Sequence, residues 1–189
     1  LGFILYEPSP RCISLRSALE IMDSLEQPRP SMVLVDVAPS SSKLSSCNHS
    51  AIDFFQIHFP LDTDPTQIRE WSEIVGREKL WLAPQIPPSE NFPETLLPLA
   101  NGFLIDAYSE AEFGGTGKKS DWAEFIRLKT SFPEKDWILA GGLGPENLMK
   151  AVKQAQPDVL DCNSGVEDRP GEKNLLKMQQ LFSVLNMAD

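Results

Sequence analysis

Short apolar runs recur along the chain and predict seven β-strands. Both alternating positions of each run are largely apolar, which is typical of parallel strands that are covered on both faces. The runs lie at residues 2–6, 32–38, 53–58, 80–84, 102–107, 137–141 and 158–163.

Segments with apolar residues three or four positions apart separate these runs and predict helices. The clearest is 64–76, where Trp71 and Val75 share one face. Asp64 is expected to cap this helix and Gly76 to end it. The other helices are expected at 15–26, 43–50, 93–100, 120–129 with Ser120 as cap, 144–155 with Pro145 at its start, and 172–186.

The strand starts recur every 21 to 35 residues, and a helix or room for one follows each strand. Repeated strand–helix units predict a parallel sheet, either open and doubly wound or closed as a barrel. No Gly-x-Gly-x-x-Gly follows the first strand, so the dinucleotide fingerprint is absent. Glycines follow the last three strands instead, at 114–117, 141–142 and 165. Phosphate often sits at the corresponding loops of (βα)₈ barrels, so we favour a single barrel domain over residues 1–189.

Composition and charge narrow the function classes. The 189 residues carry a net charge of −10, which argues against a partner with a phosphate backbone such as nucleic acid. No apolar stretch is long enough to span a membrane, and the first residues lack the basic region of a signal peptide. The spacing of Cys12, Cys47 and Cys162 suggests neither disulfides nor a metal site, which fits a reducing cytoplasm.

One acidic residue stands out, because Asp106 ends the apolar run "GFLID" and precedes a glycine-rich loop. Taken alone, an aspartate in this position is more often a turn or capping residue than a proton donor. A carboxyl group shielded by apolar neighbours and an anionic ligand would stay protonated at neutral pH and could act as a general acid. The residues alone leave both interpretations open.

Five segments in order resemble successive signatures of the phosphoribosylanthranilate isomerase family of tryptophan biosynthesis. They are "GFILYEPSPR", "FFQIHF", "LIDAYSEAEFGGTGKKSDW", "ILAGGLGPENL" and "DCNSGVEDRPGEKN", and the likeness runs from residue 2 to about residue 183. The resemblance implies an α/β fold of the TIM (βα)₈-barrel type. It also implies an Amadori rearrangement of N-(5-phosphoribosyl)anthranilate to 1-(2-carboxyphenylamino)-1-deoxyribulose 5-phosphate, a small phosphorylated substrate, and neither cofactor nor metal.

The resemblance also assigns roles to particular residues. It makes Asp106 the general acid that protonates the ring oxygen of the sugar, and Arg11 the residue that binds the anthranilate carboxylate. Gln56 and His58 alternate on one strand and so point to the same side, either as pocket residues or as buried polar groups paired inside the fold. Asp161 is a candidate substrate contact.

The phosphate is expected between the last two loops. Gly141 and Gly142 permit close approach of the backbone in the first, and the helix opened by Pro145 would offer unpaired amides. Ser164 and Gly165 are the candidate donors in the second.

The sequence departs from the family pattern at two places. Phe59 replaces the glycine that follows the histidine in the family. The family's general base is a cysteine in a Lys-x-Cys-Gly-type motif on the first barrel strand, and neither this motif nor its strand and helix is present. Cys12 lies in a loop, Cys47 in a helical region and Cys162 is expected inside the last strand, so none is expected to replace it.

Seven βα units are therefore expected where eight close a barrel, and the chain as written is expected to be inactive. An isomerase whose N-terminal unit is missing from the sequence is one explanation, and Leu1 in place of a starting methionine favours it. A non-catalytic relative that binds phosphate ligands is the second. Another phosphate-binding barrel enzyme is the third and weakest, because the Asp106 loop and Arg11 are not general features of such barrels. The oligomeric state does not follow from the sequence.

Overall fold

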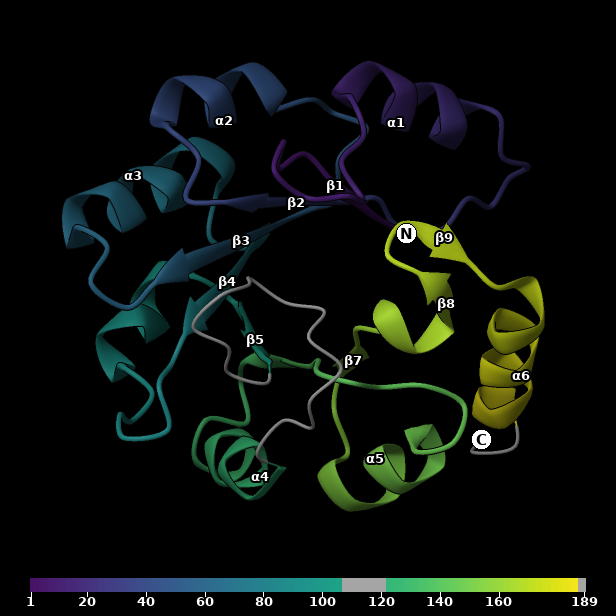
Figure 1. Cartoon of the computed structure of the whole chain (residues 1–189). Coiled ribbons are helices and arrows are strands. Elements are labelled where there is room, and N and C mark those ends of the chain that lie inside the picture. The colour runs from purple at the N-terminus through teal and green to yellow at the C-terminus, as the bar shows by residue number, and fades with distance from the viewer. Residues whose placement is uncertain (107–121, 187–189) are drawn as a thin grey trace. The chain divides into compact units, whose positions relative to one another are not determined.

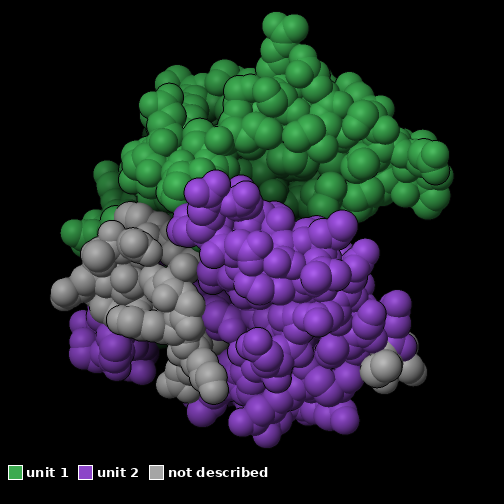
Figure 2. Space-filling view, turned by 45° about the vertical axis from the view of Figure 1, so that its right-hand side comes forward, with its two compact units in different colours: residues 1–84, 92–102 green, residues 85–91, 103–189 purple. Residues whose placement is uncertain are grey.

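The computed structural model describes residues 1–106 and 122–186. The chain divides into two compact units, and Figure 2 colours them separately. The first unit comprises residues 1–84 and 92–102, and the second comprises residues 85–91 and 103–189. The glycines at 114–117 and the expected cap Ser120 lie outside the described residues.

The first unit is built on four neighbouring strands in sequence order. They are β1 (Gly2–Ile4), β2 (Val33–Val37), β3 (Phe54–Pro60) and β4 (Leu80–Gln85). β1 pairs with β2 and β2 with β3 in parallel, with Val35 opposite Gln56 and Val37 opposite His58. The first strand is shorter than predicted, because the chain turns away after Ile4 and Tyr6 accepts a turn hydrogen bond from Ser9.

Helices follow these strands, as the strand–helix alternation predicts (Figure 1). They are α1 (Leu15–Asp23), α2 (Ser41–Cys47), α3 (Pro65–Val75) and the 3₁₀ helix η1 (Glu94–Leu99). The predicted ends of α3 are confirmed, since Asp64 accepts the N–H of Thr66 at 2.8 Å and Gly76 follows with φ 81°. The helix expected at 93–100 is a 3₁₀ helix instead, because Pro98 inside it cannot supply an α-helical hydrogen bond.

The second unit repeats the pattern with neighbouring strands β5 (Gly102–Ile105), β6 (Asp136–Leu139) and β7 (Val159–Leu160). Its helices are α4 (Trp122–Ser131), α5 (Leu148–Ala155) and α6 (Leu175–Asn186). β6 and β7 are parallel. β7 is much shorter than expected, so the prediction that Cys162 lies inside the last strand is wrong.

A short hairpin in the second unit was not predicted. After the 3₁₀ turn η2 (Ser164–Val166), β8 (Glu167–Arg169) pairs with β9 (Glu172–Lys173) in antiparallel fashion. These strands are too short to show an alternating pattern. The hairpin occupies the residues where the last helix was expected to begin, so α6 starts at Leu175.

Each unit has its own aromatic core. In the first, Trp71 lies at 5.5 Å from Phe59 between ring centroids, and its indole N–H donates to Pro39 O at 2.9 Å. In the second, Trp137 lies at 5.5 Å from Phe103 and donates to Phe132 O at 2.9 Å. The Trp71 and Trp137 indole groups therefore contribute apolar area with their donors paired, whereas Trp81 Nε1 is buried without a hydrogen-bond partner among the residues described. None of the helices described is both long and apolar enough to span a membrane.

A tight contact at Gly102 yields a stability prediction. A Cβ at this position would lie 2.1 Å from Trp81 Cδ1, and the Trp81 ring is buried and stacked on Phe54 with centroids 4.5 Å apart. We expect Gly102→Ala to lower the free energy of unfolding by about 1–3 kcal/mol, since the ring has to shift. Urea denaturation measures this.

Gly2→Ala is the matched control, because its Cβ would meet Val35 Cγ2 at an ordinary 3.8 Å. Equal stabilities of the two variants would contradict the overpacking at Gly102.

Candidate functional site

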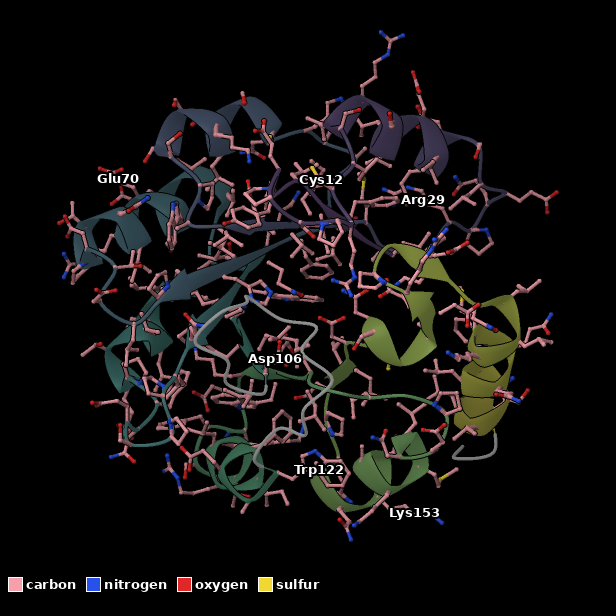
Figure 3. All side chains as sticks on the ribbon, in the orientation of Figure 1. Cys12, Arg29, Glu70, Asp106, Trp122 and Lys153 are labelled. Carbon is pink, nitrogen blue, oxygen red and sulfur yellow. The ribbon has the colours of Figure 1, made fainter. Side chains whose placement is uncertain are left out.

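The predicted site residues follow strand ends in both units. In the second unit, Asp106 follows β5, Gly141 lies two residues past β6, and Asp161 follows β7. Ala140 donates to Ile105 O at 3.0 Å and Asp161 donates to Leu139 O at 2.9 Å, so the three strand ends are tied together. Figure 3 labels Asp106 near the end of β5, where its side chain is half-buried.

The loop after β6 adopts a conformation that requires glycine. Gly141 has φ 92° and Gly142 has φ 62°, which other residues adopt only with strain. The Asn147 side chain closes the loop: its Nδ2 donates to Gly142 O at 2.8 Å, and its Oδ1 accepts the N–H of Gly144 at 3.0 Å. The backbone of Gly141 and Gly142 is thereby held in one shape.

The predicted start of the following helix at Pro145 is wrong. α5 begins at Leu148, and the N–H groups of Asn147 and Leu148 both donate to Gly144 O. A turn therefore precedes the helix, and it uses the amides that the sequence analysis expected to be free for an anion.

The turn after β7 lies against this loop. A Cβ on Gly165 would be 2.0 Å from Leu143 O, and one on Gly144 would be 3.1 Å from Gly165 O. Backbone meets backbone here, so position 165 accepts only glycine without a shift of the main chain.

These two adjacent segments leave four main-chain donors open. Within the described part of the chain, the N–H groups of Gly141, Gly142, Ser164 and Gly165 donate to no protein acceptor. Clusters of neighbouring main-chain N–H donors can bind anions, phosphate in particular. These four residues are the ones that the sequence analysis assigned to the phosphate, and a contact of Gly165 with Leu143 and Gly144 links the two segments.

The first unit holds Arg11, Gln56 and His58. Arg11 is half-buried in the loop after β1, and its N–H donates to Ser9 Oγ at 3.2 Å. Gln56 is buried, and its Nε2 lies 3.0 Å from His58 Nε2. The predicted shared side of Gln56 and His58 is therefore confirmed.

Burial lowers the pKa of His58 to about 4, because the surrounding protein disfavours the charged ring. The imidazole is neutral near pH 7. Since the Gln56 amide nitrogen can only donate, His58 Nε2 accepts and the ring proton lies on Nδ1.

The three cysteines are free thiols. Cys12 is exposed just after Arg11, as Figure 3 shows by its label near α1, and Cys47 is buried in α2. Burial, together with the nearby Asp161 carboxylate, raises the pKa of Cys162 to about 12. Among the described residues, no cluster of three or more His, Cys, Asp or Glu side chains could hold a metal ion.

Comparisons with known proteins agree with this geometry. The family model described as N-(5'phosphoribosyl)anthranilate (PRA) isomerase matches residues 1–184. The N-(5'-phosphoribosyl)anthranilate isomerase of Gloeothece citriformis is 32% identical over 188 residues, which cover 98% of this chain and 83% of that protein.

Solved structures extend the likeness to the fold. The phosphoribosyl anthranilate isomerase of Thermus thermophilus matches with a TM-score of 0.80 at 28% identity, covering 100% of this chain and 88% of that one. A second such isomerase, solved with reduced 1-(o-carboxyphenylamino)-1-deoxyribulose 5-phosphate, matches with a TM-score of 0.73 at 23% identity, covering 98% and 86%. The predicted barrel-type α/β class is thereby confirmed.

The lowered pKa of His58 yields a prediction for the pH dependence of stability. Below about pH 6.5 the histidine of the unfolded chain binds a proton, whereas His58 of the folded chain does so only near pH 4. The unfolded state therefore binds more protons in this window, and stability falls as the pH is lowered through it. We expect a loss on the order of 3 kcal/mol from pH 6.5 to 4 that is absent in His58→Gln.

Urea denaturation of both proteins across this pH range tests the prediction. His58→Gln keeps an acceptor for Gln56 but does not titrate. Parallel curves for the two proteins would show that His58 does not contribute to the pH dependence.

Proposed function

We propose, from the premise that this chain belongs to the N-(5'-phosphoribosyl)anthranilate isomerase family, that its strand-end groups bind and rearrange that family's substrate. The reaction is the Amadori rearrangement of N-(5-phosphoribosyl)anthranilate to 1-(2-carboxyphenylamino)-1-deoxyribulose 5-phosphate, a step of tryptophan biosynthesis. The observation that carries the proposal is the set of four open N–H donors at Gly141, Gly142, Ser164 and Gly165.

These four donors suit the phosphate end of the substrate. A phosphate dianion gains charge-assisted hydrogen bonds from main-chain N–H groups, which are about twice as strong as neutral ones. The positive φ angles of Gly141 and Gly142 and the contact of Gly165 with Leu143 fix the donors before the ligand arrives. The ordering cost of binding is thereby reduced.

Arg11 suits the carboxylate end. A guanidinium group binds a carboxylate with two parallel hydrogen bonds, which also orients the aromatic ring. The supporting observation is the local fixing of the Arg11 backbone, because its N–H is bonded to Ser9 Oγ and the following Cys12 N–H to Ser9 O.

Gln56, His58 and Asp161 are proposed as contacts to the sugar. A neutral His58 paired with Gln56 provides a polar surface without a buried charge. Asp161 directly follows β7, three residues before Ser164.

Asp106 is proposed as the general acid. The acid protonates the furanose oxygen, the ring opens, and a base then removes the proton from C2 to give an enolamine that becomes the ketone. Asp106 directly follows β5, as catalytic groups of barrel enzymes follow strands.

The 189 residues contain no cysteine suited to act as the base that removes the proton from C2. Cys47 is buried in a helix, and a Cys162 thiol with a pKa of about 12 does not ionise at neutral pH. Cys12 lies beyond Arg11, in the loop proposed to bind the carboxylate. This observation favours a second candidate function, a phosphate-ligand-binding relative without turnover.

Activity separates the two functions. The chain is to be assayed alone and with a family-type first βα unit joined ahead of Leu1 in a host that lacks the isomerase. Rescue of growth without tryptophan by the joined chain supports the isomerase, and tight ligand binding without rescue supports the binding protein. A cytoplasmic location is part of the proposal, since all three cysteines are free thiols.

The acid assignment predicts the effect of Asp106→Asn in the joined chain. The variant keeps the size of the side chain but cannot protonate the ring oxygen, so turnover should fall about 10²–10⁴-fold with little change in ligand affinity. Loss of substrate fluorescence measures turnover.

Asp136→Asn is the control, because Asp136 is an exposed aspartate at the opposite, amino end of β6. Near-normal turnover in Asp106→Asn would return Asp106 to a capping role.

The phosphate assignment predicts the effect of Gly142→Ala. A Cβ at φ 62° strains the loop and turns its N–H groups away from the anion. We expect the affinity for reduced 1-(o-carboxyphenylamino)-1-deoxyribulose 5-phosphate, measured by calorimetry, to fall about 10-fold or more, since each charge-assisted hydrogen bond contributes roughly 1.5–3 kcal/mol.

Gly76→Ala controls for strain alone, because Gly76 has φ 81° at the end of α3 and is not among the proposed binding residues. The same affinity in both variants would place the phosphate elsewhere.

A further inference from the structure

We propose that Lys173 is a positioning residue that fixes the phosphate-binding turn η2, an inference that rests on the proposed function. Lys173 itself contacts none of the four open donors in any hydrogen bond described above. Its role is to hold the two residues that flank the turn.

The Lys173 ammonium group reaches both ends of η2. Its Nζ donates to the main-chain oxygen of Asn163 at 3.2 Å and to the Asn163 side-chain oxygen. The same Nζ donates to Glu167 Oε1 at 2.8 Å. Asn163 directly precedes Ser164 and Glu167 directly follows Val166, so one cation joins the start and the end of the turn.

The β8–β9 hairpin makes this contact possible. It folds the chain back so that Lys173 on β9 lies opposite Glu167 on β8. Asn174, just before α6, and Lys177 in its first turn reinforce the contact: Asn174 N donates to Val166 O at 2.8 Å and Lys177 Nζ donates to Glu167 O at 2.6 Å. In Figure 1 the hairpin, η2 and α6 form one cluster at the C-terminal end of the colour scale.

Burial of the Glu167 carboxylate costs free energy. Its side chain is only 3% exposed, and a buried carboxylate loses several kcal/mol of hydration. Its Oε1 accepts from Lys173 and from the N–H of Gly171. The Lys173 side chain is 43% exposed, so the ion pair is only partly buried. A pair of this kind contributes little net stability, so its value here lies in the geometry that it fixes.

A backbone contact holds the other side of η2. Gly165 is in backbone contact with Leu143, so η2 is held between the loop after β6 and the Lys173 cation. The backbone of Ser164 and Gly165 is thereby held on both sides.

A second lysine has the same arrangement in the first unit. Lys43 Nζ lies 2.7 Å from Asp36 Oδ2, whose side chain is 11% exposed, and donates to Leu5 O at 3.1 Å. Leu5 begins the loop that carries Arg11, and the N–H of Ile13 closes that loop on Ile4 O at 2.9 Å. We infer that Lys43 positions the Arg11 loop for the carboxylate as Lys173 positions η2 for the phosphate.

Two probes distinguish these roles. Inorganic phosphate reports on the phosphate end and anthranilate on the carboxylate end, each titrated by calorimetry into the 189-residue chain. Lys173→Met should weaken phosphate binding about 10- to 100-fold and leave anthranilate binding unchanged, since outer contacts that orient a binding group have effects of this size. Lys43→Met should do the reverse, and Lys173→Arg and Lys43→Arg should recover part of each loss.

Arg169→Met is the matched control for the hairpin. Arg169 pairs with Glu172 in the same hairpin, but its side chain is 78% exposed and it contacts neither end of η2 in the hydrogen bonds described. It should leave both affinities unchanged. Thermal unfolding of each variant shows whether it is folded.

Wild-type phosphate affinity in folded Lys173→Met, or an equal loss for both probes, would overturn the positioning role. If Lys173→Met does not fold, Glu167→Gln decides, because it keeps the shape of the partner and removes its charge; unchanged phosphate affinity there is also contrary. A wild-type chain that binds neither phosphate nor the reduced product analogue overturns the proposed function itself.

Discussion

Parallel pairing of short strands is the constraint on which the rest of this structure depends. A parallel neighbour cannot be reached by a tight turn, so the chain has to cross back over the sheet before the next strand. In the second unit this brings the carboxyl ends of β5, β6 and β7 to one edge. Asp106, Gly141 and Asp161 meet there although they are far apart in the sequence.

Polar groups in the structure follow two opposite rules. The buried carboxylates Asp36 and Glu167 form ion pairs with Lys43 and Lys173, because an isolated buried charge is unstable. The N–H donors of Gly141, Gly142, Ser164 and Gly165 are left open within the described residues. An open main-chain donor costs free energy unless water or a ligand satisfies it, so such a cluster is a feature of a binding site.

Binding and turnover place different demands on this chain. Binding needs fixed N–H donors and a cation. The second unit contains the donors in a loop closed by Asn147, and the first contains Arg11, whose backbone is hydrogen-bonded to Ser9. Turnover also needs a base, and the Cys162 thiol, with its pKa raised to about 12, is unsuited to that step. Family membership and the state of the cysteines are therefore separate facts, the first about descent and the second about chemistry.

The sequence by itself determined the strand–helix alternation and the family. Apolar periodicity and the caps of α3 are local properties, so Asp64, Trp71 and Gly76 could be interpreted without neighbours in space. Glycine also marks positions where the backbone can adopt a positive φ, and Gly141 and Gly142 both adopt one.

Only the tertiary structure decided where hydrogen bonds between distant residues form. The sequence predicts a helix start at Pro145. The Asn147 side chain instead forms hydrogen bonds with Gly142 O and Gly144 N, and α5 begins at Leu148. The β8–β9 hairpin and the ion pairs of Lys43 and Lys173 have no signal in the sequence, because each depends on contacts between segments that meet only when the chain folds back. Periodicity reports which side of an element is buried, but the partner of a buried charge is fixed by the path of the chain in space.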